Sequence, residues 1–367
     1  MNTINAPQQQ RHLLAFWDEL DVAGRRRLQE QIADVDLDLV ERLYHGHEVA
    51  PDWASLAQRA ESPPAFRLRP SGEERFSHDE AVARGRQALA EGRIGAVLVA
   101  GGQGTRLGFE HPKGMYPAGP VSQRTLFQIF VDRLLAVGRR YNARIPLYLM
   151  TSPATDAETI AYFAAHDRLG MPVDDLTIFC QGTMPAVDAE TGKVLLSAKD
   201  SIALSPDGHG GTLTALAKHG CLKDCRRRGI EQLFYFQVDN PLTQVCDPAF
   251  IGYHLLCESE VSTQVIAKHE PGERLGVLAT IDGKVQIIEY SDLPPADAAR
   301  RAADGSLALW AGNTAVHVFD VDFLERVRHQ ADALPYHRAH KKVSYVDSAG
   351  DVVEPQAPNA IKFERFI

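Results

Sequence analysis

The sequence predicts an α/β protein built around a mixed, mostly parallel central sheet with helices on both faces. Three observations lead to this prediction. Short apolar runs alternate with stretches of helical period between residues 93 and 238, and hairpin-like strands follow residue 260. Such alternation is typical of parallel sheets covered by helices. The composition, 44% hydrophobic and 24% charged residues in a chain of 367, is that of a globular protein with a large core.

The first 70 residues are expected to form an N-terminal helical region that ends in a linker. Apolar residues recur there at the i, i+3, i+4, i+7 spacing of an amphipathic helix. They are Leu13, Phe16, Trp17 and Leu20, and then Leu37, Val40, Leu43 and Tyr44. Turn-forming residues concentrate from Ser62 to Gly72 and predict the linker. We therefore divide the chain into a helical region, 1–70, and a main domain, 71–367.

The main domain is expected to begin with four strands separated by helices. The strands are Ile94–Ala100, Ile145–Met150, Leu176–Cys180 and Leu233–Val238, and the helices are Arg124–Val137, Asp156–His166 and Thr212–Lys218. Ligands of such sheets bind beyond the carboxyl ends of the strands. The residues that follow the first and fourth strands are therefore the first candidates for a site.

Antiparallel strands are expected between about residues 260 and 320. Thr263–Lys268, Gly276–Ile281 and Lys284–Glu289 are short apolar segments. Asp282-Gly283 between the last two is a strong signal for a two-residue hairpin turn. We expect these strands to extend the main sheet.

A glycine-rich loop, Gly101–Gly108, follows the first strand and leads to Pro112-Lys113-Gly114. Glycines let backbone amides approach phosphate oxygens, and Arg106 and Lys113 add fixed positive charge. The alternative is a tight turn with solvated charges. A dinucleotide fingerprint does not fit because Gly108 comes one residue late, and the order Pro-Lys-Gly does not fit a Walker loop. These spacings count against an oxidoreductase or a kinase.

Asp239 ends the fourth strand and is the candidate metal ligand. Mg²⁺ typically takes one or two carboxylates and completes its shell with substrate phosphates and water. The alternative is that Asp239 and Asn240 only form the turn before Pro241. With a phosphate loop at the same sheet edge, we predict that Asp239 binds Mg²⁺ and joins it to a nucleotide phosphate.

Charge and cysteine usage exclude several classes of protein. The net charge is −9, from 48 acidic residues against 39 Lys and Arg, which argues against nucleic-acid or anionic-membrane partners. The five cysteines are scattered without a C-x-x-C pair, so we expect reduced thiols rather than a zinc site. We see no signal peptide and no apolar run near 18 residues, and we expect a cytoplasmic protein.

Motifs along nearly the whole chain resemble those of eukaryotic-type UDP-sugar pyrophosphorylases, and most closely the UDP-N-acetylglucosamine pyrophosphorylase branch. The matching segments are Gly101–Gly108, Pro112–Gly114, Thr125–Gln128, Met150–Ser152, Pro206–Gly211, Val238–Asn240, Glu289–Ser291, Gly312-Asn313, Lys341-Lys342 and Pro358–Lys362. The resemblance implies a GT-A-like Rossmann nucleotidyltransferase. It also implies a reaction in which UTP and a sugar 1-phosphate, here N-acetylglucosamine 1-phosphate, give a UDP-sugar and pyrophosphate with Mg²⁺.

The same resemblance implies roles for individual residues. Nucleotide-binding residues would be Val99, Ala100, Gly101, Gly102, Gln181, Gly208, Asp239 and Lys342. Sugar-binding residues would be His209, Glu289, Tyr290 and Asn313. Arg106, Lys113 and Lys362 would be catalytic, through their positive charge, and Asp239 would be the metal ligand.

The chain departs from the family pattern in three places. His209 stands where the family has asparagine, and Ala360 stands where it has glycine. Relatives also carry a further C-terminal domain, which we expect this chain to lack. Two alternatives therefore stay open: a pyrophosphorylase for glucose or galactose 1-phosphate, and a weakly active regulatory relative that binds nucleotide sugars. The oligomeric state is not predicted.

Overall fold

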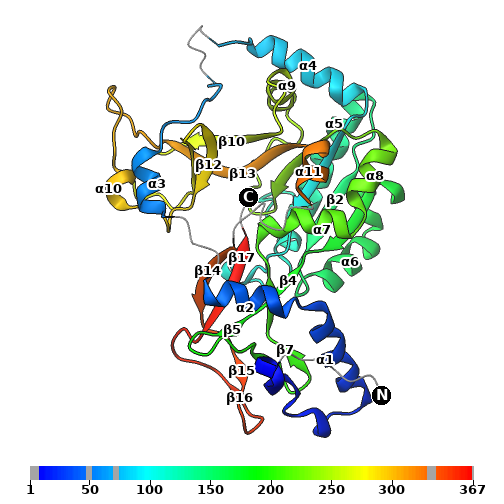
Figure 1. Cartoon of the computed structure of the whole chain (residues 1–367). Coiled ribbons are helices and arrows are strands. Elements are labelled where there is room, and N and C mark those ends of the chain that lie inside the picture. Colours follow the sequence, from blue (N-terminus) through cyan, green and yellow to red (C-terminus); the bar gives the residue numbers. More distant parts are fainter. Residues whose placement is uncertain (1–7, 47–51, 69–73, 329–335, 366–367) are drawn as a thin grey trace. The chain divides into compact units, whose positions relative to one another are not determined.

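The computed structural model describes residues 8–46, 52–68, 74–328 and 336–365, which fall into two compact units (Figure 1). The main unit comprises residues 51–180 and 213–331, and the second unit comprises 1–50, 181–212 and 332–367. The helices before residue 50 thus share a unit with two later segments, whereas the sequence suggested a boundary near residue 70. That domain division stays a prediction, and part of its linker lies outside the described residues.

The main unit is built on one mixed sheet with strand order β12-β11-β13-β9-β1-β2-β3 and β10 beside β13. Its strands are β1 (Ile94–Val99), β2 (Leu147–Thr151), β3 (Leu176–Cys180), β9 (Gln232–Gln237), β10 (Val261–Ala267), β11 (Val277–Ile281), β12 (Lys284–Ile288) and β13 (Ala311–Asp320). The pairs β1–β2, β2–β3 and β1–β9 are parallel, and the strands from β10 to β13 pair antiparallel. The predicted fold class and the antiparallel extension are confirmed.

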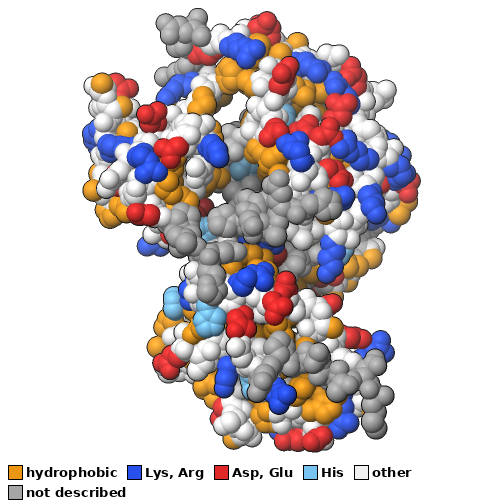
Figure 2. Space-filling model, in the orientation of Figure 1, with side chains coloured by type: hydrophobic (Ala, Val, Ile, Leu, Met, Phe, Trp, Pro, Cys, Tyr) orange, Lys and Arg blue, Asp and Glu red, His pale blue; other side chains and the backbone are white. Residues whose placement is uncertain are grey.

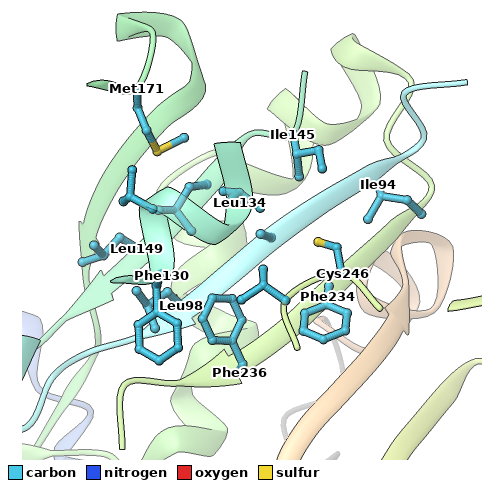
Figure 3. Close-up of a cluster of buried hydrophobic side chains, with 14 of the residues drawn as sticks. Ile94, Leu98, Phe130, Leu134, Ile145, Leu149, Met171, Phe234, Phe236 and Cys246 are labelled. Carbon is cyan, nitrogen blue, oxygen red and sulfur yellow. The ribbon is translucent and has the colours of Figure 1, made fainter. Parts of the chain in front are cut away.

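The core of the main unit lies between this sheet and α5 (Leu126–Tyr141) (Figure 3). Phe130 of α5 and Phe236 of β9 are buried with their ring centroids 5.1 Å apart. Fully burying one such side chain contributes about 1.5–3 kcal/mol. Thr125 caps the start of α5 by accepting a hydrogen bond from the Gln128 amide, and Asn142 ends it in the left-handed conformation. The helix therefore begins two residues after the predicted start at Arg124 and continues four residues beyond the predicted end at Val137.

Two helices of the main unit, α4 (His78–Ala90) and α9 (Pro248–Leu256), cross at backbone contact. A Cβ at Gly85 would lie 1.9 Å from the Pro248 carbonyl oxygen, and one at Gly252 would lie 1.7 Å from that of Ala81. Only glycine fits at either position. The remaining helices of this unit are α3 (Trp53–Arg59), α6 (Asp156–Ala165), α8 (Cys221–Arg228), α10 (Pro295–Ala298) and α11 (Val321–Val327), and α7 (Thr212–Lys218) starts at its boundary.

The second unit packs N-terminal helices on small sheets. Its α-helices are α1 (Val22–Asp34) and α2 (Leu37–His45), and its three-stranded sheet has the order β14 (Tyr336–Lys341), β17 (Ala360–Arg365), β5 (Val187–Asp188). Further short pairs are β4 (Thr183–Pro185) with β8 (Leu204–Pro206), β6 (Leu196–Ala198) with β7 (Ser201–Ile202), and β15 (Tyr345–Val346) with β16 (Val352–Val353). Val40 and Leu43 of α2 share a buried cluster with Ile361 and Phe363 of β17.

The helix expected over Leu13–Leu20 is wrong in type. The chain forms two 3₁₀ segments, Gln8–Leu14 and Trp17–Glu19, in place of an amphipathic α-helix. The α-helix begins only at Val22, because the Asp21 carboxylate accepts a hydrogen bond from the Gly24 amide at 2.7 Å and caps it there. Leu13 and Phe16 are nevertheless buried, as their apolar character predicts.

Charged side chains are spread over the face of the molecule shown in Figure 2. Acidic and basic side chains are interspersed on the face shown in Figure 2, so this face carries no field of one sign. Among the helices in the described part of the chain, none combines the length and the apolar character needed to span a bilayer.

His254 on α9 is buried and neutral. It is 1% exposed, its Nδ1 lies 2.9 Å from Ser262 Oγ, and its Nε2 lies 2.9 Å from Gln232 Oε1. Because an amide oxygen only accepts, Nε2 carries the proton and Nδ1 accepts from the hydroxyl. Burial lowers the pKa of His254 to about 4.

We predict that His254 makes folding pH-dependent in mildly acidic solution. An unfolded histidine titrates near pH 6.5, so its contribution to the free energy of unfolding is complete above about pH 6.5 and is lost as the pH falls towards 4. The loss is at most about 3 kcal/mol, and it should disappear in His254→Asn. Urea unfolding at a series of pH values should show a steeper pH slope for the wild type. Equal slopes would contradict the prediction.

Candidate active site

The candidate site begins where the parallel strands β1 and β9 end side by side. Their register pairs Val99 with Gln237, and β2 lies on the other side of β1. The segments that follow, Ala100–Gly102 and Val238–Asn240, therefore emerge at one edge of the sheet. This is the position at which open α/β sheets bind ligands. The two segments lie at the ends of β1 and β9, as the sequence predicts, and their role in binding stays a prediction.

The glycine-rich loop folds back on itself and brings Lys113 beside Gly102. The Lys113 amide donates to the Gly102 carbonyl at 3.0 Å, and the Gly104 amide donates to His111 at 2.9 Å. The buried hydroxyl of Ser152, at the end of β2, donates to the Gly101 carbonyl at 2.7 Å. The sequence analysis did not assign this role to Ser152. A residue with a hydroxyl group directly after a predicted strand could have indicated a hydrogen bond to the neighbouring loop.

Lys113 and Asp239 form an ion pair at this edge. Lys113 Nζ lies 2.7 Å from Asp239 Oδ1, and the two side chains are 18% and 57% exposed. Arg133 of α5 donates to the carbonyls of Pro241 and Thr243 and so holds the turn that follows Asp239. Arg106 is exposed in the short 3₁₀ segment Thr105–Leu107, and among the described residues no hydrogen bond or ion pair joins it to Lys113 or Asp239. The structure thus brings Lys113 and Asp239 together and leaves Arg106 apart from them.

Asp239 fits the chemistry of a magnesium ligand that works together with a substrate. Its half-exposed carboxylate is a hard oxygen donor and already has a cation, the Lys113 ammonium, as its partner. No cluster of three or more His, Cys, Asp or Glu residues in the described part of the chain would hold a metal ion by itself. A magnesium ion at Asp239 would therefore draw its other ligands from phosphate oxygens and water.

Glu289 and Asn313 meet Gly276 at the same edge of the sheet. Val277 pairs with both Ile288 and Gly312, which brings the three neighbouring residues together. Because β13 runs antiparallel to β9, its first residues lie toward the carboxyl end of β9. A Cβ at Gly276 would lie 3.0 Å from Glu289 Oε1. Burial raises the pKa of Glu289, and the charge of Asp292 raises it further.

Asn313 is held by a bulge in β13. Its amide donates to the Gly276 carbonyl at 2.8 Å, and its Oδ1 accepts from the Ala315 amide at 2.9 Å. Ala315 has φ +54°, a left-handed conformation that is uncommon for alanine, and the pairing of β10 with β13 shifts register here. Oδ1 of Asn313 is thus engaged within the fold. The Nδ2 group is the donor that this side chain can offer to a ligand.

Tyr290 is exposed next to Glu289 and borders a pocket of about 200 Å³. The pocket is also lined by Lys268, Pro271, Gly272, Glu273, Leu293, Pro295 and Ala298. Lys268 is buried, and burial lowers the pKa of its ammonium. Sequence reasoning singled out Tyr290 but not this pocket.

The other predicted site residues belong to the second unit. Gln181 is buried directly after β3, Gly208 has φ +83°, Lys342 is exposed after β14, and Lys362 lies in β17 opposite Ala339. The side chain of His209 lies outside the described residues. Ala360, which replaces a family glycine, is accommodated, because its methyl group is buried in a cluster with three other apolar residues. These are Ala186, Leu195 and Ala203.

Comparisons with known proteins identify the family of this chain. Residues 65–367 match the family model described as UTP–glucose-1-phosphate uridylyltransferase. The chain is 38% identical to UDP-N-acetylhexosamine pyrophosphorylase-like protein 1 from Homo sapiens, over 98% of this chain and 73% of that protein. It is also 38% identical to UDP-N-acetylglucosamine pyrophosphorylase from Saccharomyces cerevisiae, over 77% of this chain and 60% of that protein.

A solved structure is similar as well. The uridine diphosphate N-acetylglucosamine pyrophosphorylase from Trypanosoma brucei superposes with a TM-score of 0.80 at 26% identity. The similarity covers 98% of this chain and 72% of that one. The family resemblance seen in the sequence motifs is thereby confirmed.

We predict that two glycines of the loop respond differently to alanine. At Gly102, a Cβ would meet nothing closer than Lys113 Nζ at 3.8 Å, whereas at Gly114 it would lie 2.1 Å from the Phe127 ring. Gly102→Ala should change the free energy of unfolding by less than about 0.5 kcal/mol. Gly114→Ala should lower it by about 1–3 kcal/mol through overpacking. Urea unfolding of both variants measures the difference, and equal losses would contradict the prediction.

Proposed function

The chain belongs to the UTP–glucose-1-phosphate uridylyltransferase family, and we propose that its sugar substrate is N-acetylglucosamine 1-phosphate. It is a uridylyltransferase, which makes a UDP-sugar and pyrophosphate from UTP and a sugar 1-phosphate. The observation that supports the phosphate chemistry of this reaction is the Lys113–Asp239 pair beside the glycine-rich loop. The choice of sugar is supported by relatives at 38% identity whose names specify N-acetylated sugars.

The reaction depends on positioning and on charge neutralisation. An oxygen of the sugar phosphate attacks the α-phosphorus of UTP in line, and the bond to the leaving pyrophosphate breaks. The attacking phosphate is already ionised at neutral pH, so no side chain has to remove a proton. Two polyanions must approach each other, and fixed positive charge lowers the cost of this approach.

The main unit supplies the phosphate side of this chemistry. The backbone from Val99 to Gly102 would line the nucleotide, and Gly102 leaves open space next to Lys113 Nζ. Lys113 and Arg106 would neutralise charge on the triphosphate. Asp239 would hold Mg²⁺, which, when bound, would neutralise further phosphate charge. Lys113 Nζ lies 2.7 Å from Asp239 Oδ1. This short distance supports placing the Lys113 ammonium and a Mg²⁺ ion held by Asp239 against the same phosphates.

The sugar side would use Glu289, Tyr290 and Asn313. A Glu289 carboxylate accepts hydrogen bonds from sugar hydroxyls, and the Nδ2 group of Asn313 donates to an oxygen acceptor. The remaining residues of the second unit keep their predicted roles. Gln181 and Gly208 would contact the uracil, His209 the sugar, and Lys342 and Lys362 the phosphates. We also propose that the reaction takes place in the cytoplasm, because the five cysteines are an odd number scattered along the chain without a C-x-x-C pair, which is typical of proteins in a reducing compartment.

The proposal is tested by pyrophosphate release from UTP, Mg²⁺ and a panel of sugar 1-phosphates. We expect the highest kcat/KM with N-acetylglucosamine 1-phosphate. A preference for glucose or galactose 1-phosphate would contradict the choice of sugar. UTP or UDP-sugar binding without turnover would instead indicate a regulatory relative.

We predict that Lys113→Ala lowers kcat/KM by about 100- to 1000-fold, because it removes one charge that stabilises the transition state. The free energy of unfolding should change by less than about 1 kcal/mol, since the Lys113–Asp239 pair is partly exposed. Lys284→Ala, an exposed lysine of β12, is the matched control and should keep wild-type activity. Retained activity in Lys113→Ala would contradict the assigned role.

A further inference from the structure

The loop Pro206–Gly211, here called the Gly208 loop, lies against the last residues of β17 within the second unit. The Arg365 amide donates to the Asp207 carbonyl at 2.8 Å. Arg365 Nη2 also donates to Asp207 Oδ2 at 3.2 Å. A main-chain hydrogen bond and an ion pair therefore join the Gly208 loop to the end of β17. Asp207 and Arg365 are 158 residues apart in the sequence.

The ion pair is buried. The side chains of Asp207 and Arg365 are 7% and 14% exposed, and the guanidinium carbon of Arg365 lies 4.7 Å above the ring of Tyr336 on the neighbouring strand β14. Burial raises the pKa of Asp207, although Arg365 acts in the opposite direction. Removing the guanidinium would leave an unpaired buried carboxylate, which is costly.

The glycines of the loop pack directly on this pair. A Cβ at Gly208 would lie 2.2 Å from the Arg365 carbonyl oxygen, and one at Gly210 would lie 2.8 Å from Arg365. A Cβ at Gly211 would lie 2.0 Å from Asp207 Oδ1. Asp207 and Arg365 thus occupy the space that side chains at these three positions would need, which explains the glycines. The backbone of the loop therefore follows the positions of Asp207 and Arg365.

We propose that the Asp207–Arg365 ion pair is a positioning device that holds the Gly208 loop in its nucleotide-binding conformation. The inference rests on the proposed function, in which Gly208 contacts the uracil of UTP. Arg365 lies three residues after Lys362 on the same strand, so the pair also couples the loop to the strand that carries a predicted phosphate-binding lysine. Neither Asp207 nor Arg365 needs to touch substrate for this role.

The test compares UTP binding among variants of the full chain. Calorimetric titration with UTP and Mg²⁺ reports binding without turnover, and pyrophosphate release gives KM for each substrate. We expect Arg365→Met to raise the Kd and the KM for UTP at least tenfold, because a displaced loop misplaces the base. The KM for the sugar 1-phosphate should change less than threefold. Arg365→Lys keeps the charge but loses the planar group that stacks on Tyr336, so its Kd for UTP should lie between those of the wild type and Arg365→Met.

Two further variants separate positioning from loss of folding. Lys199→Met removes the Lys199–Glu19 ion pair, 2.6 Å long and in the same unit, and should leave UTP binding unchanged. If Arg365→Met fails to fold, Asp207→Asn replaces it, because this change is nearly isosteric and removes only the charge. It should also raise the KM for UTP selectively.

The outcomes distinguish this inference from the proposed function. If the wild type neither binds UTP nor releases pyrophosphate, the proposed function is wrong and the inference falls with it. If the wild type does both, and the folded Asp207 and Arg365 variants bind UTP as tightly as Lys199→Met, only the positioning role is wrong. Equal rises in both KM values would likewise overturn it, since they would indicate a general structural loss.

Discussion

The parallel pairing of β1 with β9 is the interaction on which the candidate site depends. Six residue pairs fix this register, from Ile94 opposite Gln232 to Val99 opposite Gln237. Both strands are buried, so a slip by one residue would turn every side chain to the wrong face of the sheet. The carboxyl ends of β1 and β9 are therefore held side by side at one edge of the sheet. The glycine-rich loop and Asp239 meet because the core behind them permits no other alignment.

Local sequence signals were sufficient for much of the fold. The four apolar runs, the helix after Thr125 and the Asp282-Gly283 turn were predicted, because each is determined by residues close in sequence. The helices α4, α8, α9, α10 and α11 were not predicted. The amphipathic patterns of α4 and α9 are weak, since backbone contact at Gly85 and Gly252 takes the place of large apolar side chains. The 3₁₀ segments near Leu13 were mistaken for an α-helix because burial alone does not reveal helix type.

The candidate site was predictable to the extent that it follows chain order. Lys113 and Asp239 were both expected beyond strand ends, and the parallel sheet brings them together. Ser152 was missed because its hydroxyl acts on a neighbouring loop, and the Asp207–Arg365 pair was missed because it joins distant segments. Two glycine-rich loops that look alike in sequence also differ in space. Gly102 lies beside open space, whereas Gly208 lies against the backbone of Arg365.

Lys113 and Asp239 serve as each other's counter-ion. A phosphate that attracts the ammonium away leaves the carboxylate without its cation, and this increases the affinity of the carboxylate for another one. By thermodynamic reciprocity, a cation that takes the carboxylate frees the ammonium for an anion by the same factor. With the roles proposed above for Lys113 and Asp239, this one ion pair would make the capture of a nucleotide and the capture of a divalent ion cooperative.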